Sequence, residues 1–328
     1  MRAAAAIAAA DGRPGGSRVI IDLVLAAAGL GLLIVGGDLL VRGAVAASLR
    51  LGIPALVVSL TVVAFGTSAP ELLVAVQAAI RGAPDIGVGN VVGSNIANIL
   101  VVLGLPALIL PILLRDGETR RIYLLMGLTS VAFVGLCFLA PLGIWHGVVL
   151  LALMAVVLHD NMLSARAGAV TVDPGLLEGC ASPLRTVLYL AGGIAVLPFG
   201  ADFLIDGARG VARAAGVSEA AIGLTLVALG TSLPELATSV MAALRRHADV
   251  AMGNVIGSNI FNLALIMGVT SFFGPVAIAP KFLQLDLWIM LAATALLGPF
   301  VWFDGRIGRR AGGAFVAAYA AYAWLALS

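Results

Sequence analysis

Long apolar stretches separated by short polar segments run along the chain from residue 18 to residue 327. A bilayer core about 30 Å thick needs about 20 predominantly apolar residues to cross it as a helix, and charge, glycine or proline marks the ends. The pattern therefore predicts an all-α integral membrane protein with ten transmembrane helices. The expected spans are 18–41, 54–80, 86–113, 120–140, 144–159, 183–205, 220–244, 250–273, 282–303 and 311–327.

Two polar motifs interrupt these stretches, and each occurs twice. Gly-Thr-Ser-Ala-Pro-Glu ends at Glu71, and Gly-Thr-Ser-Leu-Pro-Glu ends 164 positions later at Glu235. Gly-Asn-Val-Val-Gly-Ser-Asn-Ile-Ala-Asn ends at Asn98, and its copy ends at Asn262, again 164 positions later. The constant offset indicates an internal duplication without insertions between the motifs.

The duplication divides the chain into two groups of five spans. The expected organisation is a disordered leader (1–17), a first five-span repeat (18–160), a cytoplasmic linker (161–182) and a second five-span repeat (183–328). Because five is an odd number, the second repeat must enter the membrane from the opposite side. Inverted repeats of this kind are a common design of secondary transporters.

Lysine and arginine near the ends of the spans predict the orientation, since these residues resist translocation. With the N-terminus outside, twelve of the 19 lysines and arginines lie on the cytoplasmic side and seven on the outer side. We therefore expect a multi-pass protein of the cell membrane with both termini outside.

Composition supports a membrane protein and excludes other classes. Hydrophobic residues make up 61% of the chain and charged residues 11%, whereas soluble domains hold about 25% charged residues. The formal charge of +2, spread over the ends of spans, gives no basis for nucleic-acid binding. We expect no enzyme activity, no cofactor and no obligate protein partner.

The first motif places a helix breaker and an acid inside an apolar span. Proline removes a backbone donor and clashes with the preceding turn, so Pro70 and Pro234 predict broken helices. Broken backbone at membrane depth is tolerated where it lines a polar cavity. The hydroxyls and carboxylates of that cavity are expected to come from Thr67, Ser68, Glu71, Thr231, Ser232 and Glu235.

The second motif adds uncharged oxygens on one helix face. Ser94 and Asn98 are four residues apart, as are Ser258 and Asn262, so each pair projects from the same side of its helix. The combined set holds two carboxylates, hydroxyls, amides and free carbonyls, with no histidine or cysteine. Such a set suits hard cations, and Ca²⁺ and Na⁺ are the natural candidates.

Asp38 and Asp202 also recur at the 164-residue offset, near the ends of the first and sixth spans. Asp38 can pair with Arg42 one turn along the helix, whereas position 206 holds another acid. We favour a structural or gating role for both residues over a role as ion ligands.

Together the two motifs resemble the alpha repeats of the calcium/cation antiporter superfamily, particularly its prokaryotic sodium/calcium exchanger branch. The resemblance implies that spans 2, 3, 7 and 8 hold the ions and that spans 1 and 6 slide across them. It also implies that Glu71 and Glu235 are the central ligands and that the carbonyls of Ala64 and Ala228 line outer sodium sites. Some exchangers carry aspartate where this chain has Asn262, which leaves one carboxylate fewer.

The leading hypothesis is a Na⁺-driven Ca²⁺ antiporter working by alternating access. Proton- or potassium-coupled exchange by the same fold and an ion channel remain as alternatives. The Thr-Ser pair before each Pro-Glu favours sodium because it offers additional ligands for a small cation. An intramembrane serine protease is disfavoured because no histidine lies in the middle of a span.

Overall fold

The computed structural model describes residues 15–114, 117–139, 141–167, 182–215 and 230–327. Of the predicted leader, residues 1–14 lie outside this part. So do residues 168–181 of the predicted linker and residues 220–229, the first ten residues of the predicted seventh span.

The first half of the chain is almost entirely helical. The predicted second span consists of four helical pieces, and the third of three pieces that end in a short strand. The elements are α2 (Gly15–Leu51), α3 (Ala55–Val58), η1 (Ser59–Val63), α4 (Ala64–Thr67), α5 (Ala69–Ile80), α6 (Pro84–Ala97), η2 (Asn98–Val102), α7 (Gly104–Ile109), β1 (Ile112–Leu113), α8 (Gly117–Cys137) and α9 (Ile144–Ala167).

The described part of the second half contains a similar series of helices, but its short strand comes before the last helix and not after the third span. Its elements are α11 (Pro183–Ala214), α14 (Leu233–Leu244), α15 (Ala248–Ile260), η4 (Phe261–Ile266), α16 (Met267–Thr270), η5 (Phe282–Asp286), α17 (Leu287–Pro299), η6 (Phe300–Asp304), β2 (Arg306–Ile307) and α18 (Arg309–Leu327). The η elements are π-helical turns, which often occur at functional positions.

Among the described residues, seven helices are long and apolar enough to cross a membrane. An eighth span results when the two parts of the second span, Ala55–Thr67 and Ala69–Ile80, are counted together, although they bend by 46°. Of the other two predicted spans, α14 is a short apolar helix of 12 residues, and α18 is not among the seven. The structure is thus a helical membrane protein, while the count of ten stays a prediction.

The predicted all-α class is confirmed, and one short two-stranded sheet interrupts the helices. Residues 112 and 113, predicted as the end of the third span, form β1, which pairs antiparallel with β2 so that Ile112 lies opposite Ile307. Pro111 explains the change, because a residue before proline is pushed toward extended backbone. Leu110 accordingly has φ −138° and ψ 132°.

Three helices extend beyond their predicted ends. α2 continues to Leu51, α9 to Ala167 and α11 to Ala214, so the predicted linker begins too early. Polar pairing explains the extension of α9, because Arg121 of α8 forms an ion pair with Asp160 and donates to the Asn161 side chain at 3.0 Å. The apolar pattern misses such polar helical turns.

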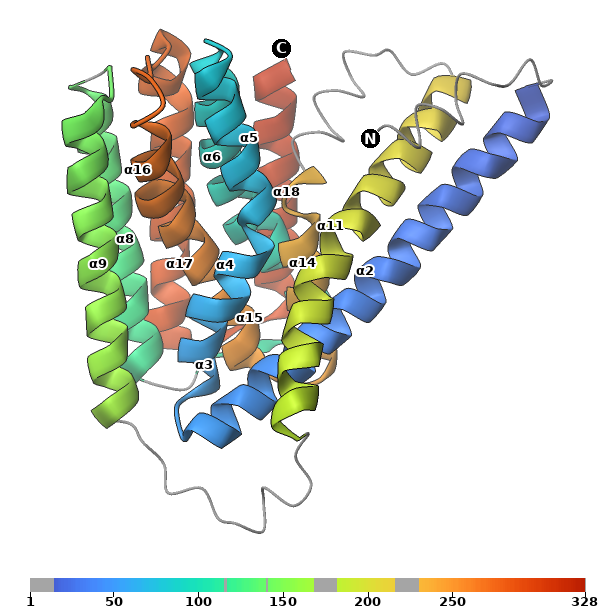
Figure 1. Ribbon diagram of the computed structural model, residues 1–328, viewed down its shortest axis with the longest axis horizontal. Helices are drawn as coiled ribbons and strands as arrows, with labels where there is room; N and C mark the ends of the chain where they lie inside the picture. The colour runs from blue at the N-terminus through green and yellow to red at the C-terminus, as the bar shows by residue number, and fades with distance from the viewer. Residues whose placement is uncertain (1–14, 115–116, 140, 168–181, 216–229, 328) are drawn as a thin grey trace.

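α2 and α11 pack against each other over most of their length and slant away from the remaining helices, as Figure 1 shows. Glycines spaced seven residues apart line this contact, at 29, 36 and 43 in α2 and at 193, 200 and 207 in α11. A Cβ on Gly29 would lie 2.3 Å from the Leu204 backbone nitrogen, and one on Gly207 would lie 2.4 Å from the Asp22 carbonyl oxygen. Side chains are thus excluded, and the two backbones touch directly.

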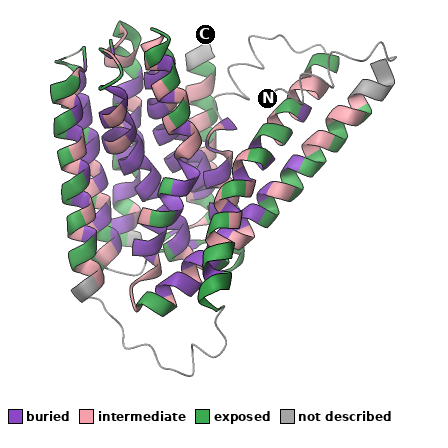
Figure 2. Ribbon diagram, in the orientation of Figure 1, coloured by how far each residue is buried: buried purple, intermediate pink, exposed green. Residues whose placement is uncertain are grey.

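The third and eighth spans form the centre of the molecule, where buried residues concentrate in Figure 2. In the most apolar 18-residue windows, 94% of the residues are buried in Ala248–Thr270 and 78% in Pro84–Ile109. A Cβ on Gly253 or Gly257 would come within 2.5 Å of a carbonyl oxygen of the second span. These helices are therefore shielded from lipid, as a site for ions requires.

Candidate ion-binding site

Both predicted breaks are present and have the same backbone geometry. Ser68 has φ −85° and ψ 7°, and Ser232 has φ −86° and ψ 4°. α5 and α14 start directly afterwards with Pro70 and Pro234 in their first turns, where a helix has no use for the missing donor. Each proline therefore stands in the first turn of a helix, and at Pro70 this helix bends by 46° from the preceding one.

The helix starts also explain the position of the acids. Glu71 and Glu235 lie in the first turns of α5 and α14, where the positive end of the helix dipole favours a negative charge. Their exposed fractions are only 1% and 0%. The sequence thus places two carboxylates at matching depth inside the protein, each supported by a helix N-terminus.

Hydrogen bonds join the two halves around Glu235. Ser68, from the first half, donates to Glu235 Oε1 at 3.1 Å, and Ser258 approaches the same oxygen at 3.5 Å. The Ser94 and Thr231 hydroxyl oxygens lie 3.4 Å apart, again across the halves. The structure therefore brings side chains of both repeated motifs into one cluster.

The remaining predicted residues that the structure describes are also buried. Asn98 and Asn262 are buried at the ends of α6 and α15, at the first π-helical turns. The Thr67 hydroxyl is 3.3 Å from both the Ala64 carbonyl oxygen and Asn254 Oδ1, either of which can accept its proton. The Ala64 carbonyl also accepts from the Ser68 amide at 3.0 Å. Ala228 lies outside the described residues.

Three asparagines that sequence reasoning left without a role support the cluster. Asn254 Nδ2 donates to the Glu235 carbonyl oxygen at 3.2 Å and to Ser239 Oγ at 3.1 Å. Asn90 Oδ1 accepts from Thr231 at 3.2 Å, and Asn259 Oδ1 accepts from Asn98. Their recurrence within the second motif was the available signal, since Asn90 and Asn254 stand at the 164-residue offset.

Several buried polar atoms of the two repeated motifs have no hydrogen-bond partner. Five are oxygens of predicted ligands, namely Glu71 Oε2, Glu235 Oε2, Ser232 Oγ, Asn98 Oδ1 and Asn262 Oδ1, and the others are Asn95 Oδ1 and Asn90 Nδ2. A buried polar atom without a partner costs about 1–3 kcal/mol, so five together are expensive. All five are oxygens with free lone pairs, the kind of atom that binds a hard cation.

The donor set fits hard cations and not transition metals. No group of three or more His, Cys, Asp or Glu side chains able to hold a metal occurs among the described residues. Zinc sites use imidazole and thiolate ligands, whereas Ca²⁺ binds six to eight oxygens in flexible geometry. Two carboxylates neutralise one Ca²⁺, and the neutral oxygens can complete its shell.

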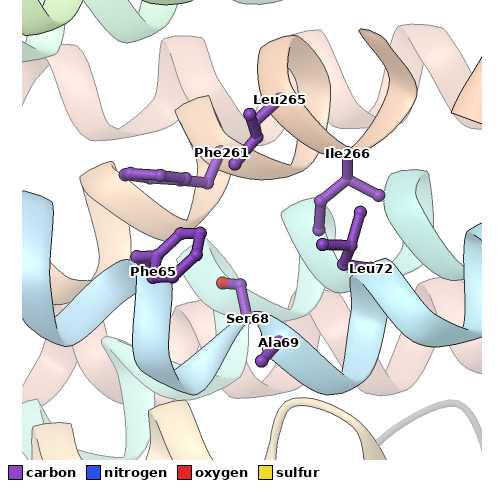
Figure 3. Close-up of a pocket in the computed structure, with 7 residues that line it drawn as sticks. All are labelled: Phe65, Ser68, Ala69, Leu72, Phe261, Leu265 and Ile266. Atoms are coloured by element: carbon purple, nitrogen blue, oxygen red, sulfur yellow. The ribbon is translucent and has the colours of Figure 1, made fainter. Parts of the chain in front are cut away.

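A small apolar pocket reaches the first break from the side. Its lining comes from the second and eighth spans: Phe65, Ser68, Ala69, Leu72, Phe261, Leu265 and Ile266 (Figure 3). The rings of Phe65 and Phe261 have their centroids 5.8 Å apart. Because Ser68 supplies the only polar side chain, the pocket cannot itself coordinate an ion and lies beside the cluster.

Comparison with known proteins gives a consistent result. The family model "Sodium/calcium exchanger protein" matches residues 21–159 and 185–328. The putative antiporter CaxA of Alkalimonas amylolytica is 36% identical over 85% of this chain and 89% of its own. The sodium/calcium exchanger MaX1 of Methanosarcina acetivorans is 30% identical over 93% of this chain and 98% of its own. A structure of the sodium-calcium exchanger NCX_Mj, soaked with Na⁺ and Ca²⁺, superimposes with a TM-score of 0.78, at 33% identity over 92% of this chain and 96% of its own.

Proposed function

The chain belongs to the sodium/calcium exchanger protein family, and from this premise we propose that its central cluster binds Na⁺ and Ca²⁺ in turn. The resemblance to the prokaryotic exchanger branch, predicted from the two repeated motifs, is confirmed. The protein is a Na⁺/Ca²⁺ antiporter, and the two ions are its substrates.

One observation supports the location of the site above all others. Five buried oxygens without partners come from both halves of the chain and from both repeated motifs. Glu71 and Glu235 are the proposed central ligands for both ions. The proposed oxygen ligands around them are Thr67, Ser68, Ser94, Asn98, Thr231, Ser232, Ser258 and Asn262, with the carbonyls of Ala64 and Ala228.

Alternating access by two inverted five-helix repeats is the proposed mechanism. Matching breaks at Ser68 and Ser232 support the repeat. Exchanged contacts support a two-fold relation between the repeats, because α5 contacts α16 at the end of the eighth span, whereas α14 contacts α7 at the end of the third. The inversion itself rests on the odd number of spans in each repeat. An inverted pair of repeats can exchange conformations and so open one face at a time.

The charge of the site bears on the transport cycle. With Glu71 and Glu235 as the only carboxylates, a site holding one Ca²⁺ is formally neutral, and so is a site holding two Na⁺. A third Na⁺ would leave one positive charge. Some exchangers have a carboxylate where this chain has the amide of Asn262. The formal charges given above therefore hold for a site with two carboxylates, as in this chain.

The test is transport by purified protein in liposomes. We expect ⁴⁵Ca²⁺ uptake to require an outward Na⁺ gradient and to saturate with Ca²⁺. Uptake driven equally well by an H⁺ or K⁺ gradient would refute Na⁺ coupling, and flux without any counter-ion would indicate a channel. Orientation in the cell membrane, with both termini outside, can be tested in intact cells by labelling cysteines placed near each end.

A further inference from the structure

The Asn98 side chain makes one hydrogen bond, and that bond determines which way its carboxamide is turned. Asn98 Nδ2 donates to Asn259 Oδ1 at 3.1 Å, while Asn98 Oδ1 is buried without a partner. A carboxamide can present either its oxygen or its nitrogen after a half-turn. With the nitrogen turned toward Asn259, the oxygen remains for a cation.

Asn259 is itself held in one orientation. Its Nδ2 lies 3.5 Å from the Asn95 carbonyl oxygen and 3.6 Å from the sulfur of Met126 on α8. Both neighbours only accept, so the Asn259 nitrogen belongs on their side and its oxygen faces Asn98. If Asn98 were reversed, two amide oxygens would face each other and an NH₂ group would face the cation.

The other half of the chain provides a natural comparison. Asn95 and Asn262 stand 164 positions from Asn259 and Asn98. Asn95 Nδ2 donates to the Val91 carbonyl of its own helix at 2.7 Å, and the oxygens of Asn95 and Asn262 are both without partners. The bond that holds Asn98 therefore has no counterpart at Asn262 in this conformation.

We propose that Asn259 is a positioning residue that fixes the carboxamide of Asn98 with its oxygen toward the transported ions. The inference rests on the proposed function, in which Asn98 is a ligand. Asn259 touches no ion and acts through Asn98 alone.

A double-mutant cycle tests this role. Asn259→Ala should raise the Ca²⁺ KM of Na⁺-driven uptake about threefold to tenfold, the range of a single hydrogen bond, with little change in maximal rate. In an Asn98→Ala background the same change should have no further effect. Asn95→Ala, the matched control, should leave KM within about twofold.

Additive effects in the cycle, or an equal effect of Asn95→Ala, would overturn the positioning role. If Asn259→Ala is not recovered folded, Asn259→Ser, too short to reach Asn98, carries the same expectation. Wild-type exchange measured in the same vesicles tests the proposed function separately. A failure of the proposed function can therefore be told from a failure of the positioning role of Asn259.

A second, independent observation concerns an ion pair between α2 and the end of α14. Asp38 of α2 pairs with Arg42 of its own helix at 2.8 Å and with Arg245 at the end of α14. The Asp38 and Arg245 side chains are 20% and 34% exposed. This contact joins the tilted α2–α11 pair to the helix that carries Glu235.

Asp202 and Arg81 occupy the corresponding positions of the other half. α5 and α14 are both 12 residues long and end in the same turn. Arg81 has φ −84° and ψ 2°, and Arg245 has φ −86° and ψ 1°. A residue with positive φ follows each, at 68° for Gly82 and 62° for Arg246.

The second pair is nevertheless not formed. Among the ion pairs of the described residues, Asp202 and Arg81 are not joined. The packing differs in the same sense, since α2 lies against α14 whereas α11 has no comparable contact with α5 within the described part. One of two equivalent contacts is closed, and the other is open.

We propose that Asp38–Arg245 and Asp202–Arg81 are alternating latches on opposite faces of the membrane. The glycine contact makes α2 and α11 move together, so a shift that brings Asp202 to Arg81 must take Asp38 away from Arg245. Only one latch can be closed at a time. This inference also rests on the proposed function, through alternating access.

Cross-linking tests the alternation. A short bifunctional thiol reagent should join Asp202→Cys to Arg81→Cys only when Na⁺ and Ca²⁺ on opposite sides drive turnover, and the product should stop exchange until it is reduced. Asp38→Cys with Arg245→Cys should cross-link in the resting protein. Asp206→Cys with Arg81→Cys, one turn further along α11, is the matched control and should not react.

The latches are refuted if the Asp202–Arg81 cysteine pair never cross-links during turnover, or if its cross-link leaves exchange intact. Each cysteine pair is first assayed for Na⁺-driven ⁴⁵Ca²⁺ uptake before cross-linking. A wild-type protein without such uptake would instead refute the proposed function.

Discussion

Glu235→Gln removes one buried carboxylate while keeping the size and shape of the side chain. Glu235 Oε1 accepts from Ser68 at 3.1 Å and lies 3.5 Å from the Ser258 hydroxyl, and Oε2 has no partner. Glutamine retains an oxygen for both hydroxyls and places its NH₂ group at the second position. The variant should therefore fold as the wild type does, and the substitution should weaken the binding of a cation.

The magnitude follows from the burial of the site. Leaving one charge of a buried pair uncompensated costs about 3–5 kcal/mol, and about 1.4 kcal/mol changes an equilibrium constant tenfold. The apparent Ca²⁺ affinity should fall by about two to three and a half orders of magnitude. A single Na⁺ beside Glu71 remains formally neutral, so its affinity should fall less.

Calcium binding by titration calorimetry and Na⁺-driven ⁴⁵Ca²⁺ uptake in liposomes measure this loss. Asp286→Asn is a matched control, because Asp286 is a buried carboxylate that accepts from Tyr322 at 3.0 Å and belongs to neither motif. Ca²⁺ affinity of Glu235→Gln within tenfold of wild type would contradict the shared site. An equal loss of Ca²⁺ affinity in Asp286→Asn would show that the effect of Glu235→Gln is not specific to the proposed site.

Three further substitutions address packing, an unpaired hydroxyl and charge. Gly29→Ala should lower Tm in detergent, because its Cβ would lie 2.3 Å from a backbone nitrogen of α11 and relieving such overlap costs about 1–3 kcal/mol. Gly31→Ala should not lower Tm, because a Cβ at this position has no neighbouring atom within 4 Å. Equal Tm values for the two variants would refute the direct backbone contact between α2 and α11. Ser232→Ala should raise the KM for Na⁺ or Ca²⁺ about threefold to tenfold at unchanged Tm, because its hydroxyl has no protein partner; unchanged KM for both ions would place it outside the site. Asn262→Asp gives the Ca²⁺-loaded site a formal charge of −1, so the mutant should take up one more cation per cycle to balance its third carboxylate. The charge moved per Ca²⁺ transported, measured as current in liposomes, should then change, and an unchanged ratio would mean that the added carboxylate binds no further transported cation.

The two helix breaks and the contacts between the motifs could be predicted because both motifs occur twice in the sequence, while the ligand roles stay a proposal. The repeated Pro-Glu pairs fixed both breaks, and helical spacing put Ser94 with Asn98 and Ser258 with Asn262. Contacts between distant segments were not predictable from spacing. Asn259 holds Asn98 across the halves, and β1 needs β2, far along the chain, to form at all.

Helix ends were the least predictable feature, for a similar reason. Apolar runs stop where polar residues begin, but a helix continues wherever those polar residues find partners. α9 passes through Asp160 because Arg121 of α8 pairs with it. The seven-residue glycine spacing of α2 and α11 was visible in the sequence, yet only the structure shows that the two rows face each other.

The length of α2 ties the protein to the lipid around it. Its 37 residues correspond to about 56 Å at about 1.5 Å per residue, nearly twice the roughly 30 Å of a bilayer core. Such a helix must lie oblique or project beyond the hydrocarbon, and Figure 1 shows it oblique to the other helices. Any motion of α2 and α11 then changes how much apolar helix meets acyl chains, at a cost of fractions of a kcal/mol per Å of mismatch. The thickness of the bilayer therefore influences which conformation of the protein is favoured. Changing the length of the lipid acyl chains should shift that equilibrium.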